Sequence, residues 1–229
     1  MPIAKYKTQP AKEANGNSER AENLERPKQG LSLFNHFSKR GFDFLVSSIG
    51  LILTGWIIIL AYIAASFDTR KGGFFTQTCI GKHGKPFTVI KIRTMRYIPS
   101  IDTTVTTTND PRITLLVRFF RKAKIDELPQ LINVFLGHMS FVGPRPDVPG
   151  FADNLSGADR IILSVRPGIT CPATLKYKNE EEILARQTDP EKYNREVIFP
   201  DKVRLNREYV ENYSFGKDIK YIFQTIIDC

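Results

Sequence analysis

Two adjacent carboxylates, Asp126 and Glu127, precede Pro129 and an apolar helical pattern that extends to Met139. Proline is tolerated in the first turn of a helix, so both acids are expected at a helix N-terminus, where the dipole favours negative charge. Several cations lie just upstream: Arg118, Arg121, Lys122 and Lys124. A carboxylate held ionised among cations can act as a nucleophile or a metal ligand. The alternative is a helix cap followed by a first-turn acid.

Further basic residues are placed where they could bind phosphate groups. Lys91 and Arg93 are two positions apart in an alternating strand pattern and therefore share one face. Arg145 lies between two prolines, and Arg166 precedes a Pro-Gly pair at a second corner of the same kind. A guanidinium on a rigid backbone can bind a phosphate at two points with little entropy left to lose. The alternative is a solvated strand face and two rigid loops with exposed arginines.

The element that dominates the chain is the segment 44–67, which has 24 residues and no charge. As a helix it would measure ~36 Å at ~1.5 Å per residue. That length is enough to cross a hydrocarbon core of ~30 Å. A core helix this apolar on every side is not expected in a chain of 229 residues, so membrane insertion is predicted.

The flanks of this segment bear on how it inserts. Lys39 and Arg40 precede it, and Arg70 and Lys71 follow it. Positive charge prefers the cytoplasmic side, so a re-entrant helix that returns to the same face would satisfy both flanks. Gly55, near the middle, offers a place for a helix break. A single-pass helix with no strong orientation signal is the open alternative.

The remaining pattern predicts an α+β fold. Residues 74–80 and 87–95, joined by a glycine-rich turn, indicate a small β-hairpin. Residues 98–110 are expected to form a loop, for which a lid over a site is one interpretation. Residues 115–122 are expected to form a basic amphipathic helix that either lies on an anionic membrane surface or packs on the core. From residue 201 an aromatic and lysine-rich pattern indicates a helix at a membrane interface or over the core.

Three regions follow from this pattern. Residues 1–30 are polar and too poor in apolar groups to order themselves, so a disordered tail is predicted. Residues 31–70 form the membrane-inserted helix region. Residues 71–229 are expected to form a mostly helical cytoplasmic domain with interfacial amphipathic helices, which would be the catalytic domain if the acids carry chemistry.

Composition limits the partners. The net charge of +9 and pI near 9.5 indicate an anionic partner. Nucleic-acid readers usually show aromatic-basic platforms or a known motif, and the chain has neither, so no nucleic acid is expected. Cys79, Cys171 and Cys229 show no metal or disulfide spacing and are expected to be reduced thiols.

Membrane insertion, fixed cations and paired acids have one common explanation. An enzyme that moves a phosphorylated group from a soluble donor to a lipid acceptor needs all three. The cations would hold the phosphates, and Mg²⁺, bound by a carboxylate and phosphate oxygens, would offset the remaining charge.

The chain also resembles the bacterial sugar transferases, or monotopic phosphoglycosyl transferases, in their minimal catalytic form. The shared motifs occur in the family's order: Lys39-Arg40-x-x-Asp43, Gly81-Lys-x-Gly-Lys-Pro-Phe87, Lys91-Ile-Arg-Thr-Met95, Asp110-Pro-Arg-Ile-Thr114, Asp126-Glu-Leu-Pro-Gln-Leu-Ile-Asn133, Met139-Ser-Phe-Val-Gly-Pro-Arg-Pro146 and Val165-Arg-Pro-Gly-Ile-Thr170.

The resemblance implies transfer of a sugar 1-phosphate from a UDP-sugar to polyprenyl (undecaprenyl) phosphate, with release of UMP. Asp126 would be the nucleophile that forms a covalent phospho-Asp intermediate, and Glu127 would help to hold Mg²⁺. Lys91, Arg121 and Arg145 would line the phosphate site. The implied membrane element is a re-entrant helix–break–helix, with the enzyme on the cytoplasmic face of the bacterial inner membrane.

The implied pathway is the initiating step of exopolysaccharide, capsule, O-antigen or glycan synthesis. The chain departs from the family's pattern at Gly55-Trp56, at Thr78-Cys79 and at residues 171–174, so the choice of donor sugar stays open. The alternatives are a catalytically inactive, membrane-anchored assembly partner and an anionic-lipid-binding protein. A homodimer is possible.

Overall fold

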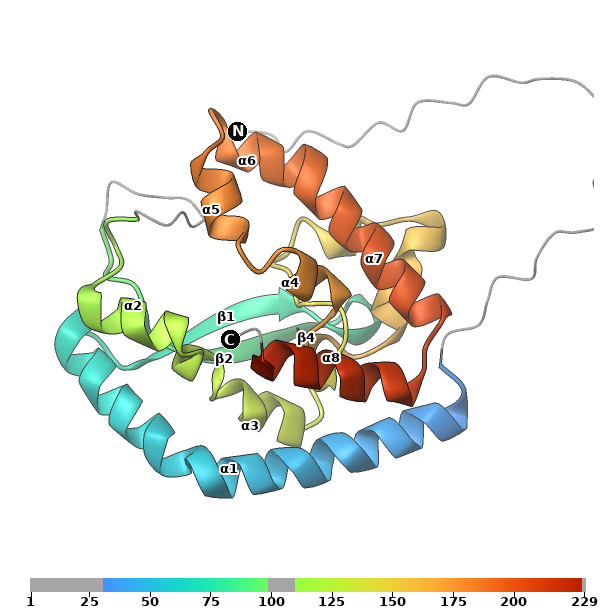
Figure 1. Ribbon diagram of the computed structural model, residues 1–229, viewed down its shortest axis with the longest axis horizontal. Coiled ribbons are helices and arrows are strands. Elements are labelled where there is room, and N and C mark those ends of the chain that lie inside the picture. The colour runs from blue at the N-terminus through green and yellow to red at the C-terminus, as the bar shows by residue number, and fades with distance from the viewer. Residues whose placement is uncertain (1–30, 99–109, 228–229) are drawn as a thin grey trace, which may run out of the picture.

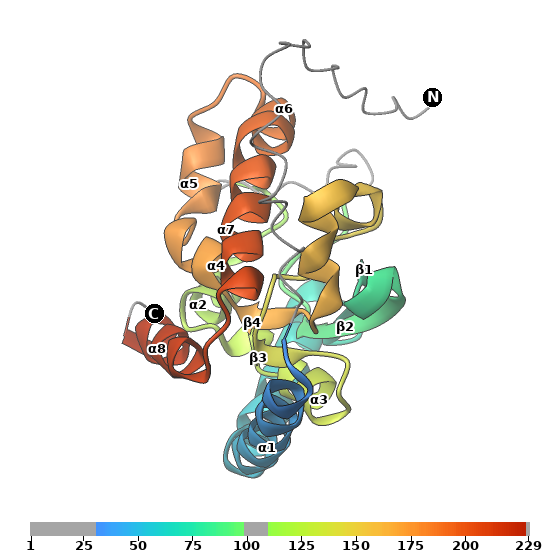
Figure 2. The same ribbon diagram turned by 90° about the vertical axis from the view of Figure 1, so that its right-hand side faces the viewer.

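The computed structural model describes residues 31–98 and 110–227. The predicted tail at 1–30 and nearly all of the predicted loop at 98–110 lie outside the described residues. The described part is α+β and mostly helical, as predicted, with two small sheets. Figures 1 and 2 show a long helix, α1, along one edge of the molecule and helices α5, α6 and α7 at the opposite end.

Helix α1 (Leu33–Thr69) is one helix of 37 residues that contains the whole predicted apolar segment. It bends near its middle, and both arms turn toward the rest of the molecule (Figure 1). The Thr54 hydroxyl donates to the Gly50 carbonyl at 2.7 Å, a back-bond that favours bending in helices. The implied helix–break–helix is therefore a continuous bent helix here, and Gly55 lies within it.

The outer surface of α1 is apolar, the reverse of a helix in a water-soluble protein. Only 17% of its most apolar 18-residue stretch is buried. Exposed side chains include Ile52, Leu53, Trp56, Ile59, Leu60 and Phe67. Apart from Ile58, the buried positions are small or polar, among them Asp43, Ser47 and Ala65. Because a core helix would bury its apolar side chains instead, this surface fits association with a membrane.

The predicted hairpin is confirmed. Strands β1 (Phe74–Ile80) and β2 (Pro86–Ile92) pair antiparallel, with Gln77 opposite Val89. The second strand ends at Ile92 and not at Met95 as predicted. Cys79 is buried and free in the hairpin, as expected of a reduced thiol.

A second sheet joins two segments that the sequence pattern presented only as rigid loops. Strand β3 (Ser140–Val142) pairs in parallel with β4 (Gly168–Thr170). Gly143 and Gly168 meet backbone to backbone, and a Cβ at Gly168 would lie 2.1 Å from the Gly143 nitrogen. Only glycine permits this approach. The contact places the two Arg-Pro corners, more than twenty residues apart, side by side.

The other helices complete the fold. They are α2 (Leu115–Lys122), α3 (Gln130–Phe135), α4 (Pro172–Lys176), α5 (Glu180–Ala185), α6 (Pro190–Tyr193), α7 (Phe199–Glu211) and α8 (Phe215–Ile227). Helix α2 was predicted to lie on a membrane surface or to pack on the core, and the structure shows that it packs on the core and leaves an apolar outer side exposed. It buries Val117 and Phe120 but exposes Leu116 and Phe119.

Helix α8 likewise has one face buried against the core and one exposed apolar face. Asp218 is buried and binds Lys39 of α1 at 2.5 Å, while the Tyr209 hydroxyl donates to it at 2.7 Å. Phe223 and Ile226 remain exposed on the other side. The C-terminal helix therefore covers the core with one face and presents an apolar surface with the other.

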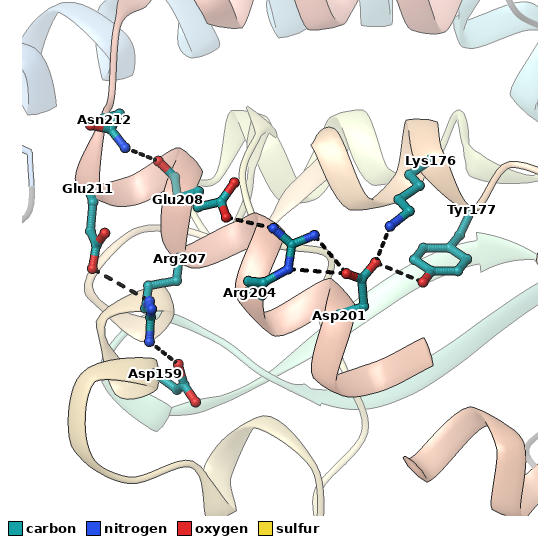
Figure 3. Close-up of polar contacts among 9 residues, drawn as sticks. All are labelled: Asp159, Lys176, Tyr177, Asp201, Arg204, Arg207, Glu208, Glu211 and Asn212. Atoms are coloured by element: carbon teal, nitrogen blue, oxygen red, sulfur yellow. Dashed lines mark hydrogen bonds and ion pairs between the residues drawn. The ribbon is translucent and has the colours of Figure 1, made fainter. Parts of the chain in front are cut away.

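Helix α7 is held by ion pairs on its outer face (Figure 3). Asp201 accepts hydrogen bonds from Lys176 at 2.6 Å and Tyr177 at 2.8 Å, which joins α4 to α7. Arg207 binds Asp159 at 2.9 Å, which joins the 3₁₀ segment Gly157–Ser164 to α7. Each exposed pair contributes little alone, but together they fix the helix against its neighbours.

Candidate active site

The acidic pair lies in a short 3₁₀ turn, Ile125–Glu127, directly before α3. Lys124 opens the turn in the left-handed conformation (φ 54°), and Pro129 occupies the N-cap of α3. The acids were predicted in the first turn of this helix, and they lie one turn earlier. Their apolar neighbours Ile125 and Leu128 pack on the core cluster formed by Ile58, Ala61, Ala65, Ile92 and Phe120. The membrane helix thus directly supports the acids.

Asn133 fixes α3 against strand β2. Its amide oxygen accepts from the Ile90 backbone N–H at 3.1 Å, and its amide nitrogen donates to the Thr88 carbonyl at 2.7 Å. The side chain is only 1% exposed. These two bonds satisfy backbone groups at the free edge of the hairpin. They also fix strand β2, which carries Lys91, beside the turn that carries the acids.

The other end of α3 is fixed by α1. Arg40 donates to the carbonyls of Val134 and Phe135, each at 2.7 Å, which caps the helix C-terminus with a positive charge. Asp43 accepts from the Phe141 backbone N–H at 3.1 Å. The basic motif before the apolar segment therefore has a structural task in addition to any preference for one membrane face.

The acids open into a cleft of about 1360 Å³. Its walls come from β2, α2, the loop after β3, α4, α5 and α7. Six of the seven predicted site residues line it: Lys91, Arg93, Arg121, Asp126, Glu127 and Arg145. The departures from the family's pattern at 171–174 and at 78–79 lie in different places. Cys171 and Thr174 line the cleft, whereas Thr78 and Cys79 do not.

Glu127 and Arg145 form an ion pair inside the cleft, and Arg145 also donates to the Ile169 carbonyl at 3.3 Å. Burial alone would raise the pKa of Glu127, but the charges of Arg145 and Lys91 outweigh it and lower that pKa to about 2. Glu127 in turn raises the pKa of Arg145 above its ordinary value. The arginine is thereby oriented across the cleft before any substrate binds.

Asp126 is in the opposite electrostatic state. Burial and the adjacent Glu127 charge raise the pKa of Asp126 to about 6. Its Oδ1 is buried and has no hydrogen-bond partner among the described residues. Such an atom is costly in a folded protein and calls for a functional explanation. An ionised carboxylate without partners, facing a cleft lined by cations, is a competent nucleophile.

The cations differ in how free they are. Burial lowers the pKa of Lys91, and the positive charge of Arg145 lowers it further. Arg121 is ion-paired with Glu181 of α5. Arg93 donates to the carbonyls of Gly72 and Phe74, which places its guanidinium at the rim near α1. Among the cations, Lys91 thus acts most strongly on Asp126, whereas Arg145 acts most strongly on Glu127.

Arg166 is the predicted site residue that the structure keeps out of the cleft. Its Nε donates to the Gly137 carbonyl at 2.7 Å, on the side of α1. The β3–β4 pairing does bring its corner next to that of Arg145, but the two side chains leave the sheet toward different surfaces. Motif similarity alone could not show this, because side-chain direction depends on strand register.

The predicted Mg²⁺ has a partial donor set here. The described residues contain no group of three or more His, Cys, Asp or Glu side chains that could hold a metal ion. Mg²⁺ typically takes one or two carboxylates and completes its shell with substrate phosphates and water. Asp126 Oδ1 is unpartnered, and Glu127 is ionised. The residues fit a Mg²⁺ ion that is shared with a phosphorylated substrate.

Among the other residues that line the cleft, Asp147 and Asn206 are candidate functional residues that the sequence pattern did not mark. Asp147 directly follows the Pro-Arg-Pro corner, so its proximity to Arg145 was available as a local signal. Asn206 lies in α7, and apart from Arg166 every predicted site residue is more than sixty positions away in the sequence. No sequence pattern marks it.

Comparison with known proteins agrees with this geometry. A family model described as bacterial sugar transferase matches residues 34–229. UDP-glucose:undecaprenyl-phosphate glucose-1-phosphate transferase of Escherichia coli (strain K12) is 34% identical over 202 residues, covering 86% of this chain and 41% of the relative. Exopolysaccharide production protein ExoY of Rhizobium meliloti (strain 1021) is 30% identical over 205 residues, covering 82% and 84%. This chain thus spans about two fifths of the first relative and most of the second.

Proposed function

The chain belongs to the bacterial sugar transferase family, and on this basis we propose that it transfers a sugar 1-phosphate from a UDP-sugar to polyprenyl phosphate. The E. coli relative is named for transfer from UDP-glucose to undecaprenyl phosphate, and the R. meliloti relative for exopolysaccharide production. These names support a nucleotide-sugar donor, a polyprenyl acceptor and a place in exopolysaccharide synthesis.

The observation that carries the proposal is the unpartnered Asp126 carboxylate in a basic cleft. In the first step an Asp126 oxygen attacks the β-phosphorus of the UDP-sugar, and the bond to the bridging oxygen breaks, which releases UMP. In the second step an oxygen of polyprenyl phosphate attacks the same phosphorus and frees Asp126. One difficult transfer is thereby divided into two.

The surrounding residues stabilise the charge that both steps develop. Arg145 and Lys91 bind the phosphoryl oxygens, and the Glu127–Arg145 pair keeps the guanidinium in position. Mg²⁺, held by Glu127, Asp126 and the diphosphate, would neutralise the leaving phosphate. Cations surround the acids on several sides, so the cleft attracts the negatively charged donor.

The lipid acceptor requires the cleft to meet a membrane. Both ends of α1 are bonded to the same folded unit, through Arg40 and Asp43 at one arm and through Asp68 and Thr114 at the other. A straight spanning helix could not hold both contacts on one side of a bilayer. We propose a re-entrant α1, with the cleft on the cytoplasmic face of the inner membrane, where UDP-sugars are made.

The test is UMP release from a panel of UDP-sugars, with the full chain in nanodiscs that contain undecaprenyl phosphate and Mg²⁺. We expect release with at least one sugar and a loss of at least about a thousandfold in Asp126→Asn. Asp189→Asn, the same chemical change at the exposed N-cap of α6, should leave the rate unchanged, because asparagine caps a helix as well as aspartate does. If folded protein released no UMP, the inactive assembly partner would replace the enzyme as the better explanation.

A further inference from the structure

The cleft has a wall that the chemistry described above does not use. Helix α7 turns Lys202, Val203 and Asn206 toward the cleft. Its opposite face carries the ion-pair network of Asp201, Arg204 and Arg207 (Figure 3). A helix fixed from outside in this way presents its inner side chains at defined positions, as a binding wall requires.

Asn206 is the first unexplained residue of this wall. It is only 6% exposed, and its Oδ1 is buried without a hydrogen-bond partner among the described residues. A buried carbonyl that is left unpaired destabilises the folded state. A leucine of similar size would avoid that cost. Since the residue lines the cleft, a ligand that donates a hydrogen bond would satisfy it.

Asp147 is the second unexplained residue of the cleft. It lines the same cleft, and no described residue donates a hydrogen bond to its carboxylate. The charge of Lys202 acts on Asp147, but its ammonium group donates its hydrogen bond to Glu180, at 2.6 Å. Burial raises the pKa of Asp147 to about 6. Asp147 therefore presents acceptor oxygens to the cleft without a bonded cation.

The chemistry of these groups selects one part of a nucleotide sugar. A carboxylate repels phosphates and cannot donate to a pyrimidine carbonyl, but it accepts well from hydroxyl groups. Position narrows the choice further. Asp147 follows Arg145 by two residues, which span at most ~7 Å. The hydroxyl-bearing group joined directly to the reacting phosphate is the sugar that is transferred.

We propose, resting on the function proposed above, that Asp147 and Asn206 bind hydroxyl groups of the transferred sugar and so determine which donor is accepted. The ribose of the nucleotide carries the same chemistry and is the other source of hydroxyl groups. A site that hydrogen-bonds a substrate hydroxyl discriminates strongly against donors that lack it, because its buried polar groups are then left unpaired.

The test is equilibrium binding of UDP-sugars, UDP and UMP by calorimetry. It uses the full chain in nanodiscs with Mg²⁺ and with Asp126→Asn present to prevent turnover. Asp147→Ala and Asn206→Leu should each weaken binding of the preferred UDP-sugar by about tenfold or more. Affinity for UMP, which lacks the sugar, should change less than about twofold. Asp189→Ala, at the exposed N-cap of α6, and Asn212→Ala, at the C-cap of α7, serve as matched controls, because neither residue lines the cleft.

Thermal unfolding separates a binding role from a structural one. Asn206→Leu removes an unpaired buried group, so its Tm should be equal to or a few degrees above that of the parent. Asn206→Ser provides a smaller replacement if leucine does not fit. Equal losses for UMP and the UDP-sugar would assign the residues to ribose and overturn the proposal, as would no loss for either. A parent protein that bound no nucleotide would instead contradict the proposed function itself.

Discussion

Asp126 and Glu127 are neighbours in the chain, yet the fold separates their proton affinities by several orders of magnitude. Arg145 binds one carboxylate and lowers its pKa to about 2, while burial beside that negative charge raises the other to about 6. Two adjacent carboxylates with divided pKa values have divided roles. Glu127 is a permanent charge that orients Arg145, and Asp126 is the group left to react.

The first prediction concerns pH. The kcat/KM for UMP release should rise about tenfold per pH unit up to about pH 6 and then level off, because this ratio reports the free enzyme and only ionised Asp126 is nucleophilic. Single-turnover measurements between pH 4.5 and 8 would show this limb. Asp147 titrates in the same range, so the limb must persist in Asp147→Asn. A profile flat below pH 6 would contradict the assignment.

The same shift predicts a stability effect. The folded state binds the Asp126 proton more tightly than the unfolded chain does, so stability is lost as pH rises from 3.8 to about 6. At pH 7, Asp126→Asn should therefore be more stable than the parent, by on the order of 2 kcal/mol. Urea unfolding at pH 7 and pH 4 measures it, and the gain should disappear at pH 4. Destabilisation at pH 7 would refute this account.

At the scale of elements, the site depends on the close pairing of β3 with β4. Gly143 and Gly168 face each other, and a Cβ on Gly143 would lie 2.3 Å from the Arg166 carbonyl oxygen. Their contact sets the loop that carries Arg145 and Asp147 against the cleft. A backbone atom cannot move aside as a flexible side chain can, so neither position tolerates a side chain.

Gly168→Ala should accordingly lower the free energy of unfolding by about 1–3 kcal/mol or more, with loss of UMP release. Gly55→Ala is the matched control, because no atom lies within 4 Å of the added Cβ in the middle of α1. Replacing that helical glycine should stabilise the protein by about 0.5–1 kcal/mol and keep its activity. Thermal unfolding of both variants in nanodiscs decides the comparison. Unchanged stability in Gly168→Ala would be incompatible with the observed pairing.

At the scale of the whole molecule, α1 is both a membrane element and the foundation of the site. Its outer face is apolar, and its inner face supports the acids through Ile125 and Leu128. Both arms of α1 contact the same folded body, and Figure 1 shows the bend between them. The membrane surface and the cleft are therefore placed relative to each other by one helix.

A re-entrant α1 places its two ends on one side of the bilayer. In a background without the native cysteines, Ser32→Cys and Lys71→Cys should both react with an impermeant maleimide in inside-out vesicles and stay unreactive in intact cells. The one tryptophan, Trp56, is 63% exposed near the bend, and its fluorescence should be quenched by lipids brominated in their acyl chains. Labelling of the two positions from opposite sides would establish a spanning helix instead.

What the sequence by itself determined is local. The uncharged apolar segment predicted a long helix suited to a membrane, the alternating pattern around a glycine-rich turn predicted the hairpin, and Pro129 predicted the start of α3. The tertiary structure decided what depends on contacts between distant residues. It paired β3 with β4, turned Arg145 into the cleft and Arg166 away from it, and placed Asn206 in the wall of the cleft that holds the acids. It also left Asp126 unpartnered, because burial and neighbouring charge, which set a pKa, exist only once the chain is folded.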